Sequence, residues 1–301
     1  MVSELRRSLS FQNHSHLSHP FFSNKTTSSL VRSTSLPCTS HPLISQLKHQ
    51  LSHLKSWANE SQPQNQTSGW LCDGLARLKT VHDYLDDVLL LPQTQDSLRQ
   101  QPDLVESLLE DFLRFVDVYG TFQTLLFALK QEHSAAQVAI RRKDESKVET
   151  YAKAVRKMER ETSKLVSTVR CAASSSCSNF ACNVDAELVQ VILDVKEVTV
   201  LVSTALFSGV SLSVVSEKPS WIGLRLGRKG RRVERGIQEF KQVGKECFLR
   251  GLRKKGDEEL RMVLKRMNGL EDCVAKIEMG SERVFRSLIN TRVSLLNLLT
   301  S

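Results

Sequence analysis

The stretch of sequence that decides the fold is Val148–Val169, which reads VETYAKAVRKMERETSKLVSTV. Its apolar positions, with one Thr among them, follow each other at alternating steps of 3 and 4 residues, and charged residues fill most positions between them. An α-helix brings such positions onto one face, and this alternation is typical of helix bundles and coiled coils. The stretch therefore predicts a long amphipathic helix that packs against other helices.

The same pattern extends to both sides of this stretch. Pro102 and Pro219 are separated by 116 residues without a proline, which permits very long helices. Strand signals are absent apart from a β-branched stretch at 198–215. Apolar residues at helical spacing predict further helices near 42–58, 68–91, 105–129, 185–205, 258–279 and 281–299, with Ser68 as an N-cap and a pause at 141–144. We predict an all-α bundle of about six to seven long helices with coiled-coil-like seams.

The chain divides into a tail and a bundle domain. Residues 1–41 are rich in Ser, Thr, His and Asn, contain a single acidic residue and show no apolar periodicity, so we expect this tail to be disordered. Residues 42–301 form the predicted bundle, with an irregular loop at 208–236 that Gly and Pro interrupt. The composition of the tail also overlaps that of an organellar transit peptide, which stays open as an alternative.

The positive charge is concentrated in two segments. Residues 218–256 contain 13 Lys and Arg against 3 Asp and Glu, and the first 50 residues contain 5 against 1, within a net charge of +9. The rest of the chain is therefore mildly acidic. This distribution favours a local contact with an anionic partner over a surface that is basic throughout.

The segment Val198–Val215 holds no charged residue over 18 positions, which raises the alternative of a membrane span. Six of these positions are Ser or Thr, Gly209 lies inside, and Asp194, Lys196 and Glu197 precede the segment. These polar residues favour a buried central helix followed by a loop.

No residue pattern indicates catalysis or metal binding. The seven cysteines have scattered spacing, and no secretory signal is evident, so we interpret them as reduced thiols in an intracellular protein. The cluster Cys171–Cys177–Cys182 matches no zinc template, and we expect small buried thiols at a Ser-rich turn. No phosphate-binding glycine loop, nucleophile elbow or metal-ligating His pair is present, since His49 and His53 lack an acidic third ligand. We predict a protein that is not an enzyme, with no cofactor and no metal.

The tail contains a candidate phosphorylation site at Ser35 within Leu30–Pro37, LVRSTSLP. Arg32 lies three residues before Ser35, as basophilic kinases prefer, and Ser33 and Pro37 complete a sequence that is similar to binding sites for 14-3-3 proteins. A phosphate there would meet an arginine cluster on its reader. Ser10 has the same kinase spacing but no following proline. We hypothesise that Ser35, and secondarily Ser10, recruit a 14-3-3 protein.

The loop contains a second candidate site, a group of six basic residues beside apolar ones. Such a group suits an anionic membrane surface or an acidic partner, and nucleic-acid phosphates are a less favoured alternative because no known DNA-binding motif surrounds it. A solvated basic loop with no partner is the remaining interpretation. The six residues are Arg225, Arg228, Lys229, Arg231, Arg232 and Arg235.

Three blocks of the sequence carry a family resemblance. They are Arg32–Pro37 with the following His41–Pro42, the block Leu85–Thr94 with LDD at its start and LPQT at its end, and Arg292–Asn297, RVSLLN. The chain resembles the plant-specific domain of unknown function 241, grouped with Bypass-like proteins. The resemblance implies an intracellular plant protein without known catalytic activity, associated with root and shoot development.

Together these observations predict a regulatory or adaptor protein, with peripheral binding to anionic lipid as the alternative function. We expect a cytoplasmic location, with peripheral membrane, nuclear and plastid locations left open. A homodimer through a spare apolar stripe is compatible with the pattern.

Overall fold

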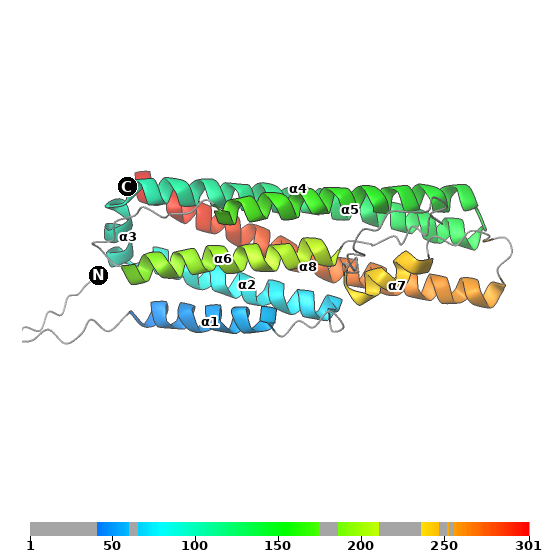
Figure 1. Cartoon of the computed structure of the whole chain (residues 1–301), viewed down its shortest axis with the longest axis horizontal. Coiled ribbons are helices and arrows are strands. Elements are labelled where there is room, and N and C mark those ends of the chain that lie inside the picture. Colours follow the sequence, from blue (N-terminus) through cyan, green and yellow to red (C-terminus); the bar gives the residue numbers. More distant parts are fainter. Residues whose placement is uncertain are drawn as a thin grey trace, which may run out of the picture. The chain divides into compact units, whose positions relative to one another are not determined.

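The computed structural model describes residues 41–59, 66–174, 186–210, 236–246, 252 and 256–300. The regular secondary structure of these residues is entirely helical, which confirms the predicted fold class (Figure 1). The helices are α1 Pro42–Asn59, α2 Ser68–Leu89, α3 Pro92–Arg99, α4 Pro102–Arg141, α5 Glu145–Ser174, α6 Ala186–Gly209, α7 Gln238–Glu246 and α8 Asp257–Thr300.

Local sequence signals set several helix ends. Pro92 and Pro102 begin α3 and α4, where a missing backbone donor costs nothing. The α4–α5 turn passes through Lys143, whose φ of 55° is left-handed. Asp144 then caps α5, since its Oδ1 accepts hydrogen bonds from the backbone of Ser146 and Lys147 at 3.1 and 3.3 Å. The predicted pause at 141–144 is therefore this turn.

The helices pack side by side along most of their length (Figure 1). α4 lies between α5 and α8, α2 lies beside α8 and α1, and α6 contacts α1, α2 and α5. The α4–α8 pair is antiparallel, because Lys130 binds Glu278 at 2.6 Å while Gln137 binds Glu271 at 3.0 Å. One continuous apolar core fills the space between these helices.

Close packing depends on glycine at one place in particular. A Cβ on Gly74 of α2 would lie 2.3 Å from Cζ2 of Trp57 in α1, so only glycine admits the indole ring. Trp57 also stacks on Trp70 with ring centroids 4.4 Å apart and donates from Nε1 to the Trp70 carbonyl at 3.2 Å. This cluster fixes α1 against the first turns of α2.

Three details of the predicted elements were wrong. The two C-terminal helices are one helix, α8, and Gly280, where they were divided, packs against Leu75 of α2. The N-cap of α2 is Thr67, whose Oγ1 accepts from Trp70 N at 3.3 Å, and Ser68 is the first helical residue. The short helices α3 and α7 bring the described helices to eight, more than predicted.

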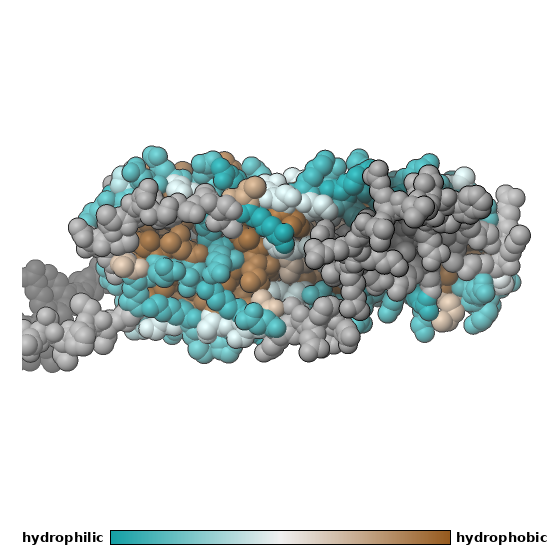
Figure 2. Space-filling view, in the orientation of Figure 1, coloured by the Kyte–Doolittle hydropathy of each residue, from teal (hydrophilic) through white to brown (hydrophobic). Residues whose placement is uncertain are grey.

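α6 carries the described part of the segment that raised a membrane alternative. Residues 198–209 belong to it, most of them buried, and residues 211–215 lie outside the described residues. On the face shown in Figure 2, apolar surface appears among hydrophilic surface over α6, whose partly buried side chains include Leu193, Val200 and Leu201. Within the described part of the chain, α4 is the one helix long and apolar enough to cross a membrane, a composition that core helices of soluble proteins share.

Candidate functional site: a buried polar seam

The core contains an ion pair that the sequence did not indicate. Lys196 of α6 lies 2.5 Å from Oδ2 of Asp111 of α4, and their side chains are 6% and 2% exposed. Arg114 adds a contact to Asp111 Oδ1 at 3.5 Å. Removing a charge from water is costly, so each member of a buried pair depends on the other. The pair therefore fixes the position of α6 along the axis of α4.

A second polar contact joins α2 to α6 and α8 through His82, which is fully buried. Thr199 Oγ1 donates to Val195 O at 2.7 Å, so His82 Nε2 donates to Thr199 Oγ1 at 3.0 Å. Nδ1 then faces the hydroxyl of Thr291 at 3.4 Å. Burial lowers the pKa of His82 to about 4, so its imidazole is neutral at physiological pH.

Asp86 extends this contact towards the surface. It hydrogen-bonds Thr291, and burial raises its pKa to about 6, with the nearby carboxylates Asp83 and Asp87 acting in the same direction. This hydrogen bond joins Asp86, which lies in the block Leu85–Thr94, to Thr291, which directly precedes the block Arg292–Asn297. These blocks are about 200 residues apart in the sequence.

Further along the bundle, two tyrosines make buried polar contacts. The hydroxyl oxygens of Tyr119 in α4 and Ser203 in α6 are 3.1 Å apart and form a hydrogen bond. Burial raises the pKa of Tyr119 well above its usual range. His133 of α4 donates from Nε2 to Met267 O at 2.8 Å and accepts at Nδ1 from the Tyr151 hydroxyl at 2.9 Å. Burial lowers the pKa of His133.

These contacts form a seam, which we define as Lys196, Thr199 and Ser203 of α6 with Asp111, His82 and Tyr119 opposite them. The three α6 residues are separated by steps of 3 and 4, so they share one face of the most apolar helix. A one-turn shift of α6 would break all three contacts. The seam thus specifies a single register for the central helix, a role that buried polar groups are known to serve.

None of the site residues predicted from the sequence lies within the described residues. Ser10, Arg32, Ser33, Ser35 and Pro37 fall in 1–40. The six basic residues at 225–235 fall in 211–235.

Described contacts do fix both ends of the basic segment, which we define as residues 211–235. Ile237 N donates to Gly209 O at 2.8 Å, so the chain leaves α6 and returns at the same place. Gln238 N donates to Gln66 O at 3.0 Å, and Glu239 Oε1 accepts from the backbone and hydroxyl of Ser68 at 2.9 and 2.7 Å. The described residues on either side of the basic segment are thus bonded to each other and to the N-terminus of α2.

Two expectations about metal and thiols can be compared with the described residues. Cys171 is exposed, so the expectation of a buried thiol was wrong at this position. Its helix ends at Ser174, and Cys177 and Cys182 lie outside the described residues. The described residues contain no group of three His, Cys, Asp or Glu side chains able to hold a metal ion.

The fold and the seam define an all-α bundle whose central helix is held by a buried ion pair and by buried hydrogen bonds. A family model described as Protein BPS1 matches residues 74–298, three quarters of the chain. The chain therefore belongs to this Bypass-like family of plant proteins. Two of the three blocks, Leu85–Thr94 and Arg292–Asn297, lie within the matched residues, and the block at 32–42 lies outside them. No curated protein and no solved structure matches the chain significantly.

Proposed function

We propose that this protein is a non-enzymatic adaptor that binds protein partners, with root and shoot development as the processes in which Bypass-like membership would place it. The observation that carries this proposal is the attachment of the basic segment. The Ile237–Gly209 and Glu239–Ser68 bonds hold both of its ends on the packed bundle. A binding segment held in this way loses less conformational entropy on binding than a free chain does.

The burial of the seam supports the absence of catalysis. His82 and Tyr119, whose pKa values are strongly shifted, are both fully buried and bonded to other side chains. A catalytic acid or base must reach its substrate within hydrogen-bond distance. These groups instead hold α2, α4 and α6 together.

The tail supplies the proposed partner contact. Phosphorylation of Ser35 would add a charge of about −1.5 to −2 that the arginine cluster of a 14-3-3 protein can bind. A second phosphate at Ser10 would engage the other half of the dimeric reader, and two linked sites raise the apparent affinity about 10²- to 10⁴-fold.

The test is the affinity of the full-length protein for 14-3-3 after treatment with a basophilic kinase, measured by calorimetry. Ser35→Ala should reduce binding more than tenfold, while Ser29→Ala, a matched tail substitution outside the motif, should leave it unchanged. Ser10→Ala should cause an intermediate loss. Equal binding by the Ser35→Ala and Ser29→Ala proteins would refute the proposed reader.

Peripheral binding to anionic lipid is the second candidate function, favoured by the six basic residues of the basic segment. Each basic residue near an anionic surface contributes about 1 kcal/mol, and salt weakens this attraction. Replacement of Arg228, Arg231, Arg232 and Arg235 by Gln should release the protein from phosphatidylserine vesicles.

The matched control removes the same charge from the exposed face of α8, at Arg261, Lys265, Arg283 and Arg286. Release by both sets alike would mean that net charge, and not the segment, drives binding. Binding only by the protein that keeps Arg228–Arg235 would assign the membrane contact to the segment.

A further inference from the structure

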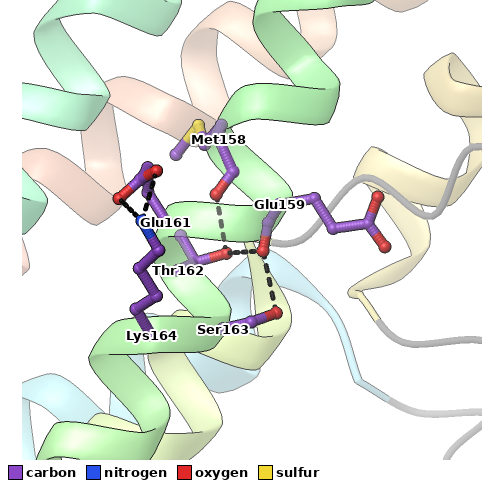
Figure 3. Close-up of polar contacts among 6 residues, drawn as sticks. All are labelled: Met158, Glu159, Glu161, Thr162, Ser163 and Lys164. Atoms are coloured by element: carbon purple, nitrogen blue, oxygen red, sulfur yellow. Dashed lines mark hydrogen bonds and ion pairs between the residues drawn. The ribbon is translucent and has the colours of Figure 1, made fainter.

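The exposed face of α5 carries a basic stripe. Its members follow each other at steps of 4, 3 and 4 residues, which places them on one side of the helix. They span about 17 Å at 1.5 Å per residue. Lys164 already binds Glu161 at 3.0 Å within the helix (Figure 3), whereas the other three have no ion-pair partner among the described residues. The basic stripe consists of Lys153, Lys157, Arg160 and Lys164, all exposed.

The neighbouring helix α4 carries an acidic stripe of similar length. Its members are separated by steps of 3, 4 and 7 residues, again on one side of the helix, and span about 21 Å. Glu110 binds Arg114 within the helix, while the other three have no ion-pair partner in the described part of the chain. The acidic stripe consists of Asp103, Glu106, Glu110 and Asp117, all exposed.

The two stripes lie end to end along the bundle. α4 and α5 are antiparallel neighbours joined by a short turn, and the His133–Tyr151 bond sets their register (Figure 1). The basic stripe at 153–164 therefore lies beside residues 120–131 of α4, and the acidic stripe lies beyond them. Residues 118–129 of α4 contain no charged side chain, so α4 does not neutralise the basic stripe.

α5 likewise leaves the acidic stripe largely unopposed. Beyond Lys164, the last ten residues of α5 contain one charged side chain, Arg170. The exposed charged residues of α4 are thus acidic along 103–117, and those of α5 are basic along 153–164, at different levels of the bundle. A surface of this kind is complementary to itself when a second copy is turned end for end, because each acidic stripe then faces a basic stripe.

We propose that the acidic and basic stripes of α4 and α5 bind a second copy of this chain, forming an antiparallel two-fold dimer. The stripes are similar in length, about 17 and 21 Å, so each acidic stripe can lie along the basic stripe of the other copy on each side of the two-fold axis. Salt screens the attraction between exposed charges over a distance that falls from about 10 Å at 0.1 M salt to about 3 Å at 1 M. The dimer should therefore dissociate as salt rises.

Sedimentation equilibrium of the full-length protein at these two salt concentrations measures this directly. The wild-type protein should approach the dimer mass in low salt and the monomer mass in high salt. A basic-to-acid variant (Lys153→Glu, Lys157→Glu, Arg160→Glu) and an acid-to-basic variant (Asp103→Lys, Glu106→Lys, Asp117→Lys) should each stay monomeric in low salt. All six positions are exposed, so both variants should keep the helical circular dichroism of the wild type.

Mixing the two variants is the decisive step. One presents an acidic face throughout and the other a basic face throughout, so an equimolar mixture should form a heterodimer. Charge reversal of three exposed α8 residues, Arg261, Lys265 and Arg283, is the control and should leave the wild-type dimer intact. A wild-type monomer in low salt, or a mixture that stays monomeric, would overturn the proposal.

Discussion

Replacement of Lys196 by Met is the most informative test of the buried seam. The substitution keeps the length of the side chain but removes its charge, so Asp111, 2% exposed, loses the ammonium at 2.5 Å. Breaking a buried pair costs about 3–5 kcal/mol. Arg114 stays 3.5 Å from the Asp111 carboxylate and offsets part of this. We therefore expect the free energy of unfolding to fall by about 3 kcal/mol, near the lower end of that range.

Urea denaturation followed by far-ultraviolet circular dichroism measures this loss. With a slope of about 3 kcal/mol per molar urea, the midpoint should fall by about 1 M. Asp111→Leu combined with Lys196→Met replaces both charges, and the double variant should recover most of the stability because the unpaired charge is gone. Lys55→Met is the matched control, since Lys55 forms an exposed pair with Glu197 and should lose less than about 1 kcal/mol.

A midpoint for Lys196→Met within experimental error of the Lys55→Met midpoint would refute the reasoning. So would a double variant less stable than Lys196→Met alone, because it would show that the carboxylate itself, and not its lost partner, matters for folding.

Three further predictions concern pH and packing. Burial raises the pKa of Asp86 to about 6, so the folded state retains a proton that the unfolded state releases between pH 4 and 6, and this group lowers stability as pH rises through that window. In urea titrations at pH 7.5, the free energy of unfolding of Asp86→Asn should exceed that of the wild type by about 1–2 kcal/mol, after allowance for the partial exposure of Asp86. At pH 4 the two proteins should be about equally stable. Burial lowers the pKa of His82 to about 4, so this group lowers stability as pH falls from 6.5 to 4, a contribution opposite in sign to that of Asp86. His82→Gln removes this contribution, so its stability should rise relative to that of the wild type over this window in the same titrations. Gly74→Ala should cost about 1–3 kcal/mol by calorimetric unfolding, because its Cβ would lie 2.3 Å from Trp57, whereas Gly269→Ala, with no atom within 4 Å, should stabilise α8.

The sequence predicted the helices well where one apolar stripe faces one core. Val148–Val169 lies inside α5, and the proline-free region holds α4, α5 and α6. The division of α8 at Gly280 was wrong because a glycine inside a helix costs about 1 kcal/mol relative to Ala but does not by itself end the helix. Here Leu75 approaches to 3.0 Å of a Cβ built on Gly280, so the small residue permits close helix packing.

The seam could not be predicted, because its partners come from helices far apart in the sequence. From the sequence alone, Lys196 is predicted to be solvent-exposed, because it lies next to Glu197. Only its contact with Asp111, 85 positions earlier, explains why it is buried in the core. A signal was nevertheless present. Lys196, Thr199 and Ser203 are polar residues at helical spacing within an apolar helix, a pattern that indicates a bonded partner on another helix.

We propose that this chain, a packed helical bundle with α6 as a core helix, acts through protein partners. Fractionation of the tagged full-length protein from plant cells, in low salt, high salt and alkaline carbonate, tests it most directly. The account predicts recovery in the low-salt supernatant, whereas release only by high salt would assign function to the basic segment. Retention in the membrane pellet after alkaline carbonate would contradict the account, because a buried, hydrogen-bonded α6 cannot also cross a bilayer.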